Sequence, residues 1–569
     1  MAKKFQPVIP LLFFAIYGVW LAFAYPYHLH FKEQITLFTG DWNFYLQKPA
    51  VIGEFLGDYL TQFYLLTGVS SIILTGLLLV LWLGIQVAFK KIGITRNTAW
   101  LALLPVAAEA ALSCLLEYPL SMVVGSTVAV WTFVAMVYLK NKRVFFIIAC
   151  IVGIILYLLI GAHFLLFIFL VLAEEIRRKN HWIIPVSTLM IALAIPLIAS
   201  RFYYLTFPQA YFYPLIERYL LKKPFLFLLT ETSMLAALIL SCYKIKKVFL
   251  YIFILIVAPL EIYAMCDFKE EYNLGLTSEA YFGNWNKVKS LSEKQKYNTY
   301  LSAYYGNLAN ARDGKLADEL LKQYQPAHFG LFLEISETGS YINLIASADA
   351  LIECGDMAQA QHSALLSMLF TPHQRSSRMT RKLAEIAIAN GEYPTAEKYL
   401  HLLSKTTLHH RWAEENRQLI ASDTVFNFSG NRAFLSQRDT LFHANDWRAS
   451  LINLIESNPL NKTAADYLLC YHLLRKDLKL FQADYDTYYY PTFGDTPSVI
   501  YQEALLICMS GDDEQQYVAK LRKYHINKEV WSKHQEFFTL LKNRQQNETK
   551  ILSTFATSYW FYFFYAQLQ

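Results

Sequence analysis

The sequence carries little charge and few residues that break helices. Asp, Glu, Lys and Arg make up 17% of its 569 residues, whereas soluble domains average about 25%. Gly and Pro number only 22 and 18, which excludes a collagen-like chain and argues against a disordered one. The net charge is +6 and no long Lys/Arg block is present, so no nucleic-acid partner is expected. With 55% hydrophobic residues, the chain is not expected to be soluble throughout.

Motifs of several familiar sites are also missing. The sequence has no nucleotide-binding loop, no nucleophile elbow and no zinc-ligand cluster. Its seven cysteines form no CxxC pair. The four cysteines beyond residue 265 are expected to be buried free thiols, because their spacing is wide. The sequence therefore indicates its architecture more clearly than its activity.

The first half of the chain consists of apolar runs. A helix that crosses the hydrocarbon core of a membrane needs about 17–25 residues. Roughly nine runs approach this length, near 8–25, 64–89, 98–116, 120–139, 144–160, 162–174, 182–200, 224–242 and 248–265. The fifth and sixth are short and are separated by Gly161, so we expect two short helices or one bent hairpin. The pattern predicts a polytopic membrane bundle of about nine spans.

Basic residues predict the orientation of this bundle. Every second loop is basic, as cytoplasmic loops are. These loops hold Lys3, Lys4, Lys90, Lys91, Arg96, Lys140, Lys142, Arg143, Arg177, Arg178, Lys179, Lys244, Lys246 and Lys247. The loop 201–223 is basic too and does not fit. The N-terminus is predicted to be cytoplasmic and the C-terminal half periplasmic, in the inner membrane of a bacterium. The start of the chain also fits a cleavable signal peptide, which would leave this sidedness unchanged.

The composition changes near Met265, which predicts a membrane domain over 1–266 and a second domain over 267–569. A recurring phrase marks the second domain: a Gly, a large residue two places on and a small residue five places on. The best copies are 355–360 and 391–396, and the looser ones begin at Gly283, Gly314 and Asn445. The phrase resembles the inter-helix turn of tetratricopeptide repeats. It predicts an all-α solenoid, with an irregular all-α domain as the alternative.

Polar residues in the predicted outside loops are the candidates for chemistry. Glu54 and Asp58 are four residues apart and share a helix face. Glu109 lies within an apolar run, where an ionisable residue is costly. The other candidates are Asp41, Glu117, His163, Arg201, Arg218, Lys222 and Lys223. The carboxylates could hold a divalent metal ion or act as a general base, and the basic residues could bind a diphosphate group. The alternatives are solvated loop faces for the acids and snorkelling to lipid headgroups for the bases.

These features resemble the GT-C class of membrane glycosyltransferases. The resemblance lies in the cytoplasmic N-terminus, the long acidic first outside loop, the acidic second outside loop and the soluble C-terminal domain outside. It implies transfer of a sugar from a polyprenyl-phosphate carrier to an envelope acceptor. It also implies Asp41, with Glu54 or Asp58 as substitutes, and Glu117 as catalytic residues. Arg201, Lys222, Lys223 and His163 would then bind the substrate. The sequence has neither the Asp-Glu pair of that class in the first outside loop nor a WWD-type tail sequence.

Other hypotheses remain open. The whole chain also resembles an uncharacterised bacterial family of multi-span proteins with helical-repeat C-termini, which implies no activity. A non-catalytic scaffold for envelope assembly would use the membrane half as an anchor and bind a protein or peptide on the repeats. A transporter is the third hypothesis. About nine spans exceed what an anchor needs, so the sequence favours the transferase.

Overall fold

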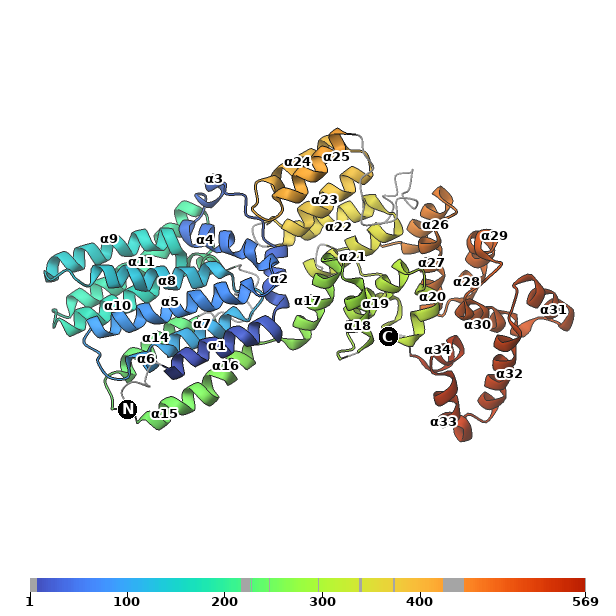
Figure 1. The fold of residues 1–569 in the computed structure, drawn as a ribbon, viewed down its shortest axis with the longest axis horizontal. Helices are drawn as coiled ribbons and strands as arrows, with labels where there is room; N and C mark the ends of the chain where they lie inside the picture. Colours follow the sequence, from blue (N-terminus) through green and yellow to red (C-terminus); the bar gives the residue numbers. More distant parts are fainter. Residues whose placement is uncertain are drawn as a thin grey trace. The chain divides into compact units, whose positions relative to one another are not determined.

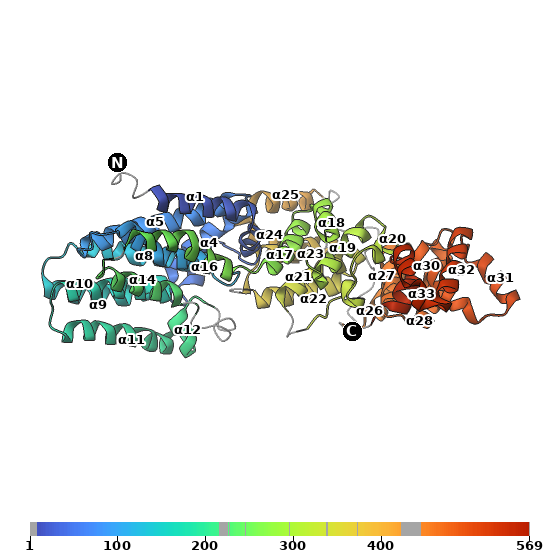
Figure 2. The same cartoon turned by 90° about the horizontal axis from the view of Figure 1, so that it is seen from below.

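The computed structural model describes residues 8–215, 226, 228–244, 246–294, 296–336, 340–371, 374–422 and 445–567. Every regular element among these residues is a helix, which confirms the all-helical prediction for this part of the chain. The protein divides into two compact units (Figures 1 and 2). The first contains Met1–Glu271 and Leu402–Arg411, and the second contains Tyr272–His401 and Trp412–Gln569. The division after Glu271 lies close to the boundary predicted after residue 266.

The first unit is a bundle of apolar helices. They are α1 (Val8–Phe23), α2 (Tyr27–Gln34), α3 (Trp42–Tyr45), α4 (Val51–Thr61), α5 (Val69–Lys91), α6 (Thr98–Leu101), α7 (Leu103–Ser113), α8 (Leu120–Met136), α9 (Lys142–Ile160), α10 (Phe164–Arg177), α11 (Ile183–Tyr203), α12 (Phe207–Phe212), α14 (Leu229–Leu240), α15 (Lys247–Ile252) and α16 (Ala258–Met265). A short 3₁₀ turn, η2 (Gly161–His163), joins α9 to α10, and a π-helical turn, η4 (Phe253–Val257), precedes α16.

Three stretches of the described chain are long and apolar enough to cross a membrane: Val69–Lys91, Lys142–Arg177 and Ile183–Tyr203. A fourth is added if α1 and α2, which meet at a bend of 68°, count as one broken span. The other predicted runs form helical stretches of 10–17 residues, among them Thr98–Ser113 and Leu120–Met136. The count of nine spans therefore stays a prediction. Several of the predicted apolar runs include turn residues at their ends, so the helices within them are shorter than the runs.

The stretch Lys142–Arg177 reverses direction in its middle. Gly161 has a positive φ of 69°, and Lys142 Nζ donates to the Arg178 carbonyl at 2.5 Å. The first residue of α9 therefore lies beside the end of α10, as in a hairpin. A Cβ on Gly161 would lie 2.3 Å from the Tyr213 carbonyl oxygen, so the residue after α9 must be glycine for both its backbone angle and its close contact.

A close contact between α4 and α8 also depends on glycine. A Cβ on Gly57 would lie 2.6 Å from the Ser121 Cα and N atoms. Substitution Gly57→Ala is therefore expected to cost about 1–3 kcal/mol of stability, because the backbone of α8 must move. The temperature of unfolding of the full chain in detergent measures this.

Gly76 is the matched control for that substitution. It is also inside a helix, α5, but a Cβ there would meet nothing within 4 Å. Gly76→Ala should leave stability unchanged or raise it by about 0.5–1 kcal/mol, since alanine restricts the unfolded chain. Equal effects of the two substitutions would contradict the α4–α8 contact.

The second unit is built from helices with polar faces. They are α17 (Phe268–Tyr281), whose first residues belong to the first unit, α18 (Trp285–Glu293), α19 (Tyr300–Arg312), α20 (Leu316–Glu319), α21 (Tyr341–Cys354), α22 (Met357–Phe370), α23 (Ser377–Ala389), α24 (Tyr393–Ser404), α25 (His410–Ala421), α26 (Trp447–Ser457), α27 (Lys462–Leu474), α28 (Leu478–Asp484), α29 (Tyr490–Phe493), α30 (Val499–Cys508), α31 (Glu514–Lys523), α32 (Lys528–Lys542), α33 (Arg544–Phe555) and α34 (Tyr559–Tyr565).

The recurring Gly phrase lies between consecutive helices of this unit. Gly283, Gly314, Gly355 and Gly391 all have positive φ, between 68° and 87°, so each ends a helix in the left-handed conformation. The small residues Ala360 and Ala396 are fully buried. The large residue of the phrase is buried as Met357 but 43% exposed as Tyr393. The phrase thus produces helix–turn–helix units, and their assignment as tetratricopeptide repeats stays a prediction.

The aromatic end of the chain packs within the second unit. Trp560 is fully buried and donates through Nε1 to the Glu503 carbonyl at 3.0 Å. The Tyr559 backbone N–H donates to the Glu503 carboxylate at 2.6 Å. These bonds dock α34 on α30. All seven cysteines are free thiols, and Cys354 and Cys470 are buried.

Candidate functional site

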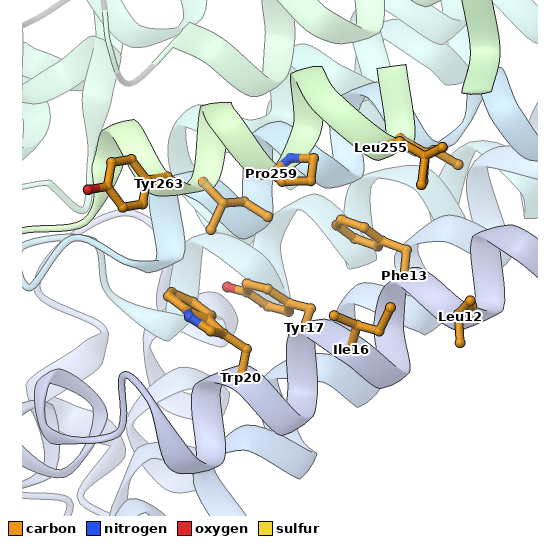
Figure 3. A pocket seen from close by; sticks show the side chains of 10 residues that line it. Leu12, Phe13, Ile16, Tyr17, Trp20, Leu255, Pro259 and Tyr263 are labelled. Carbon is orange, nitrogen blue, oxygen red and sulfur yellow. The ribbon is translucent and has the colours of Figure 1, made fainter. Parts of the chain in front are cut away.

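A groove runs along the first unit between α1 and α16 (Figure 3). It has a volume of about 330 Å³ and an almost entirely apolar lining. The lining residues are Leu12, Phe13, Ile16, Tyr17 and Trp20 of α1, Ile254 and Leu255 of η4, and Pro259, Ile262 and Tyr263 of α16. Several of them are strongly exposed, including Ile16 at 61% and Leu255 at 71%. The groove is therefore open on a side of the bundle that exposes apolar residues.

One end of the groove leads to polar residues. The Trp20 ring stacks on Tyr25 with centroids 5.3 Å apart, and the Asp267 backbone N–H donates to Tyr25 Oη at 3.0 Å. Glu271 accepts from the backbone N–H groups of Tyr27 and His28 at 2.6 and 2.9 Å. These two N–H groups belong to the first turn of α2, so a carboxylate here satisfies free donors and favours the positive end of the helix dipole.

Glu270 lies in the first turn of α17, the next helix, beside Glu271. Burial, reinforced by the negative charges of Glu117, Asp267 and Glu271, raises its pKa to about 7. Lys32 is buried in the same region and donates to the Ser113 carbonyl at 3.0 Å. A carboxyl with a pKa near neutrality can both take up and release a proton under physiological conditions, which is the property that general acid–base chemistry needs.

Glu117 is close enough to Glu270 and Lys32 for its charge to act on both, whereas the other predicted acids lie elsewhere. Asp41 is exposed and caps α3, where it accepts from the Asn43 backbone N–H at 3.1 Å. Glu54 is 2% exposed and accepts from the Tyr213 hydroxyl at 3.2 Å. Asp58, one turn further along α4, accepts from Tyr45 Oη at 3.0 Å.

Glu54 and Asp58 differ in their environments. Burial raises the pKa of Glu54 well above its usual range, and the nearby charge of Asp58 raises it further. Asp58 is half-buried. The pair therefore forms a second site where a buried carboxyl with a raised pKa lies beside another carboxyl, and Tyr213 from the loop after α12 donates to the buried one.

His163 lies inside the bundle and not at its surface. It is fully buried on η2, and its Nδ1 is 2.5 Å from Glu231 Oε1. Its Nε2 is 2.9 Å from Tyr118 Oη, and Tyr118 donates to Glu109 at 2.9 Å. The structure thus joins His163 to Glu109, the acid that the sequence placed within an apolar run.

The predicted basic residues are only partly described. Arg201 is exposed in the last turn of α11. This helix packs against α9, α10 and α12, and Figure 2 shows it on the opposite side of the first unit from α1. Arg201 is therefore apart from the groove. Lys222 and Lys223, together with Arg218, lie outside the described residues.

The sequence predicted that the carboxylates could hold a divalent metal ion. Across the residues that the structure describes, no three His, Cys, Asp or Glu side chains are grouped so that they could hold a metal ion. The acids named above are instead divided between four places in the first unit.

Two important residues were missed by sequence reasoning. Glu231 lies within the apolar run 224–242, so the rule that selected Glu109 would have selected it as well. Glu270 lies at the domain boundary, in a run of charged residues that looks like an ordinary solvated segment. Only its packing raises its pKa, so no sequence signal distinguishes it.

Together, the fold and these clusters define an all-helical protein with membrane-length apolar stretches and acidic groups buried among them. The chain belongs to a family of unknown function (DUF6057), whose model matches residues 2–566. No curated protein and no solved structure matches the chain.

Proposed function

We propose that the protein is a membrane-embedded glycosyltransferase that uses a polyprenyl-phosphate-linked sugar. The observation that carries the proposal is the apolar groove between α1 and α16, together with Glu270 and its acidic neighbours, because Glu270 lies in the first turn of the helix that follows α16. A polyprenyl carrier has the same division into a long apolar tail and a charged head. The exposed apolar residues beside the groove favour lipid as its surroundings.

In this proposal the carrier's tail lies in the groove and its head lies near Glu117 and Glu270. Ionised Glu270 takes the proton from the acceptor hydroxyl. The acceptor oxygen then forms a bond to the sugar's anomeric carbon, and the polyprenyl phosphate leaves with the electron pair of the broken C–O bond. The buried ammonium of Lys32 balances part of the acidic charge at this end.

The wider parts of the proposal follow the predicted topology. Lys32, Glu117 and Glu270 belong to segments that the basic-residue pattern predicts to face the periplasm of a bacterial inner membrane. The second unit would present the acceptor, as a protein or peptide bound to its helical pairs. Arg201 would contact the phosphate of a surrounding lipid and not that of the carrier, because it lies on another side of the unit.

The lipid site is tested by filling the groove. Ile16→Trp is expected to weaken binding of a fluorescent polyprenyl monophosphate to the purified full chain at least about tenfold, which corresponds to about 1.4 kcal/mol. The larger side chain occupies the space of the tail. Fluorescence anisotropy in detergent measures the binding.

Ile198→Trp is the matched control. Ile198 on α11 is 57% exposed, close to the 61% of Ile16, but it does not line the groove. Binding should be unchanged in this variant. Unchanged binding in Ile16→Trp, or equally tight binding of a fluorescent phosphatidylethanolamine, would contradict a carrier site in the groove.

A further inference from the structure

A continuous chain of hydrogen bonds joins four buried side chains of the first unit. Glu231 Oε1 is 2.5 Å from His163 Nδ1, and His163 Nε2 is 2.9 Å from Tyr118 Oη. Tyr118 Oη is 2.9 Å from Glu109 Oε1, whose other oxygen accepts from Thr230 Oγ1 at 2.6 Å. The residues come from α14, η2, the loop after α7 and α7 itself. Each is at most 3% exposed.

Counting protons shows that these contacts need an extra one. The three contacts between Glu231, His163, Tyr118 and Glu109 require one proton each. With both carboxyls ionised and a neutral imidazole, the groups supply only two protons, one from the imidazole and one from the tyrosine. One contact would then bring two lone pairs together in a buried place, and two negative charges would lie there. Both are costly in an apolar interior.

We propose that this chain is a proton-binding site that holds one additional proton on a carboxyl. A protonated imidazole at His163 would also supply the third proton, but it would leave one cation and two ionised carboxylates in the apolar interior, which costs more than a single negative charge. Glu231 is the preferred holder, because its Oε2 is buried and has no hydrogen-bond donor among the described residues, whereas Glu109 has donors for both oxygens. Neutral Glu231 donates to Nδ1, the imidazole Nε2–H donates to Tyr118, and Tyr118 donates to ionised Glu109.

The same three protons can shift together along the chain. The Glu231 proton moves to Nδ1, the Nε2 proton moves to Tyr118 Oη, and the tyrosine proton moves to Glu109. The result is ionised Glu231, neutral His163, neutral Tyr118 and protonated Glu109. Every contact keeps one proton and the net charge stays at −1. The chain therefore carries a proton between α14 and α7, and it does so whether or not the protein transfers sugars.

Other titratable groups lie on the helices that pack against this chain of hydrogen bonds, but they have different partners or positions. They are Lys90 and Lys91 of α5, Lys142, Arg143, Cys150 and Tyr157 of α9, Glu174, Glu175 and Arg177 of α10, Tyr211 of α12, and Glu261 and Tyr263 of α16. Within the described part of the chain, none of them is hydrogen-bonded to Glu109, His163 or Glu231. Tyr157, for example, donates to the Ala210 carbonyl at 2.7 Å.

Infrared spectroscopy of the full chain in lipid vesicles counts the carboxylic acids. At pH 7, the wild type minus the double variant Glu109→Gln/Glu231→Gln should show the C=O band of one neutral carboxyl. Glu231→Gln alone should remove the same band, and it serves if the double variant does not fold. A difference of zero or two carboxyls would overturn the proposal.

A second pair of variants tests whether the neutral carboxyl of Glu231 belongs to the chain of hydrogen bonds. Tyr118→Phe removes the acceptor of the imidazole Nε2–H, so Nδ1 becomes a weaker acceptor and the Glu231 band should move to higher frequency. Tyr157→Phe removes an equally buried hydroxyl outside the chain and should leave the band in place. An unmoved band in Tyr118→Phe shows an isolated acid and refutes the shared proton.

Discussion

Glu270→Gln is expected to lower the rate of sugar transfer by about 10²–10⁴-fold, the usual contribution of a positioned general base. Glutamine keeps the size of the side chain but cannot take a proton. The measurement is the release of polyprenyl phosphate from a radiolabelled polyprenyl-phosphate-linked hexose, with purified full chain and an envelope extract that supplies the acceptor. Binding of the polyprenyl monophosphate should change little, because the tail site in the groove remains intact.

Glu261→Gln is the control for this loss. Glu261 lies on α16, is half-buried, and is not among the charged neighbours of Glu270. Its substitution should leave the rate near that of the wild type. Equal losses in the two variants would indicate a general effect on the fold, and an unchanged rate in Glu270→Gln would rule out Glu270 as the base.

The pH dependence of transfer follows from the same pKa. A general base must be ionised, so the rate should rise with pH through about 7, the pKa of Glu270, and level off above it. Glu117→Gln removes a negative neighbour that raises this pKa. Its profile should therefore keep its shape and move to lower pH, which a merely structural role of Glu117 would not produce.

Arg378→Met is expected to destabilise the second unit by about 3–5 kcal/mol, because the buried carboxylate of Asp349 loses its closest ion-pair partner and keeps only the more distant Lys382, at 3.4 Å. Arg378 is fully buried on α23. It donates to Asp349 of α21 at 2.6 Å and to the carbonyl and hydroxyl of Thr277 of α17 at 3.1 Å. Tyr305 of α19 also donates to Asp349, at 3.2 Å. One polar cluster thus connects four helices.

Hydrogen exchange in the full chain measures this effect as lost protection of α21 and α23. Arg381→Met is the control on the same helix, since Arg381 is partly exposed and pairs with Glu385 at 3.1 Å. Its loss should cost at most about 1 kcal/mol. Arg378→Met/Asp349→Leu should recover part of the stability, because no unpaired charge remains. Similar protection in both single variants would contradict the role of the cluster.

The sequence predicted some features of the fold well because they depend on local patterns. The four glycines at 283, 314, 355 and 391 end helices as expected, since a left-handed residue is a local requirement. Gly161 was expected to separate two short helices or to bend a hairpin, and it joins α9 and α10 as a hairpin. The number of spans was less predictable, because hydropathy identifies apolar residues but does not show at which residue a helix ends.

The candidate site was predicted only in part. Glu117 and Glu109 belong to the clusters described above, and both were selected by their unusual position beside or within apolar runs. Asp41 looked equivalent in sequence, and the structure shows it exposed at the start of a four-residue helix, which it caps. His163 was expected to contact substrate in an outside turn, and it is fully buried instead. Sequence distance gives no measure of burial, so these differences could not be anticipated.

By itself, the sequence determined that the protein is helical, where its composition changes, and which short phrases turn one helix into the next. These properties depend on neighbours within a few residues, whose sterics and polarity act locally. The tertiary structure decided which acidic side chains lie close to one another. It brought Glu231 to His163 across 68 residues, and it gathered Glu117 with Glu270. Those contacts depend on how helices pack over long chain distances, where burial and neighbouring charge set the chemistry of each carboxyl.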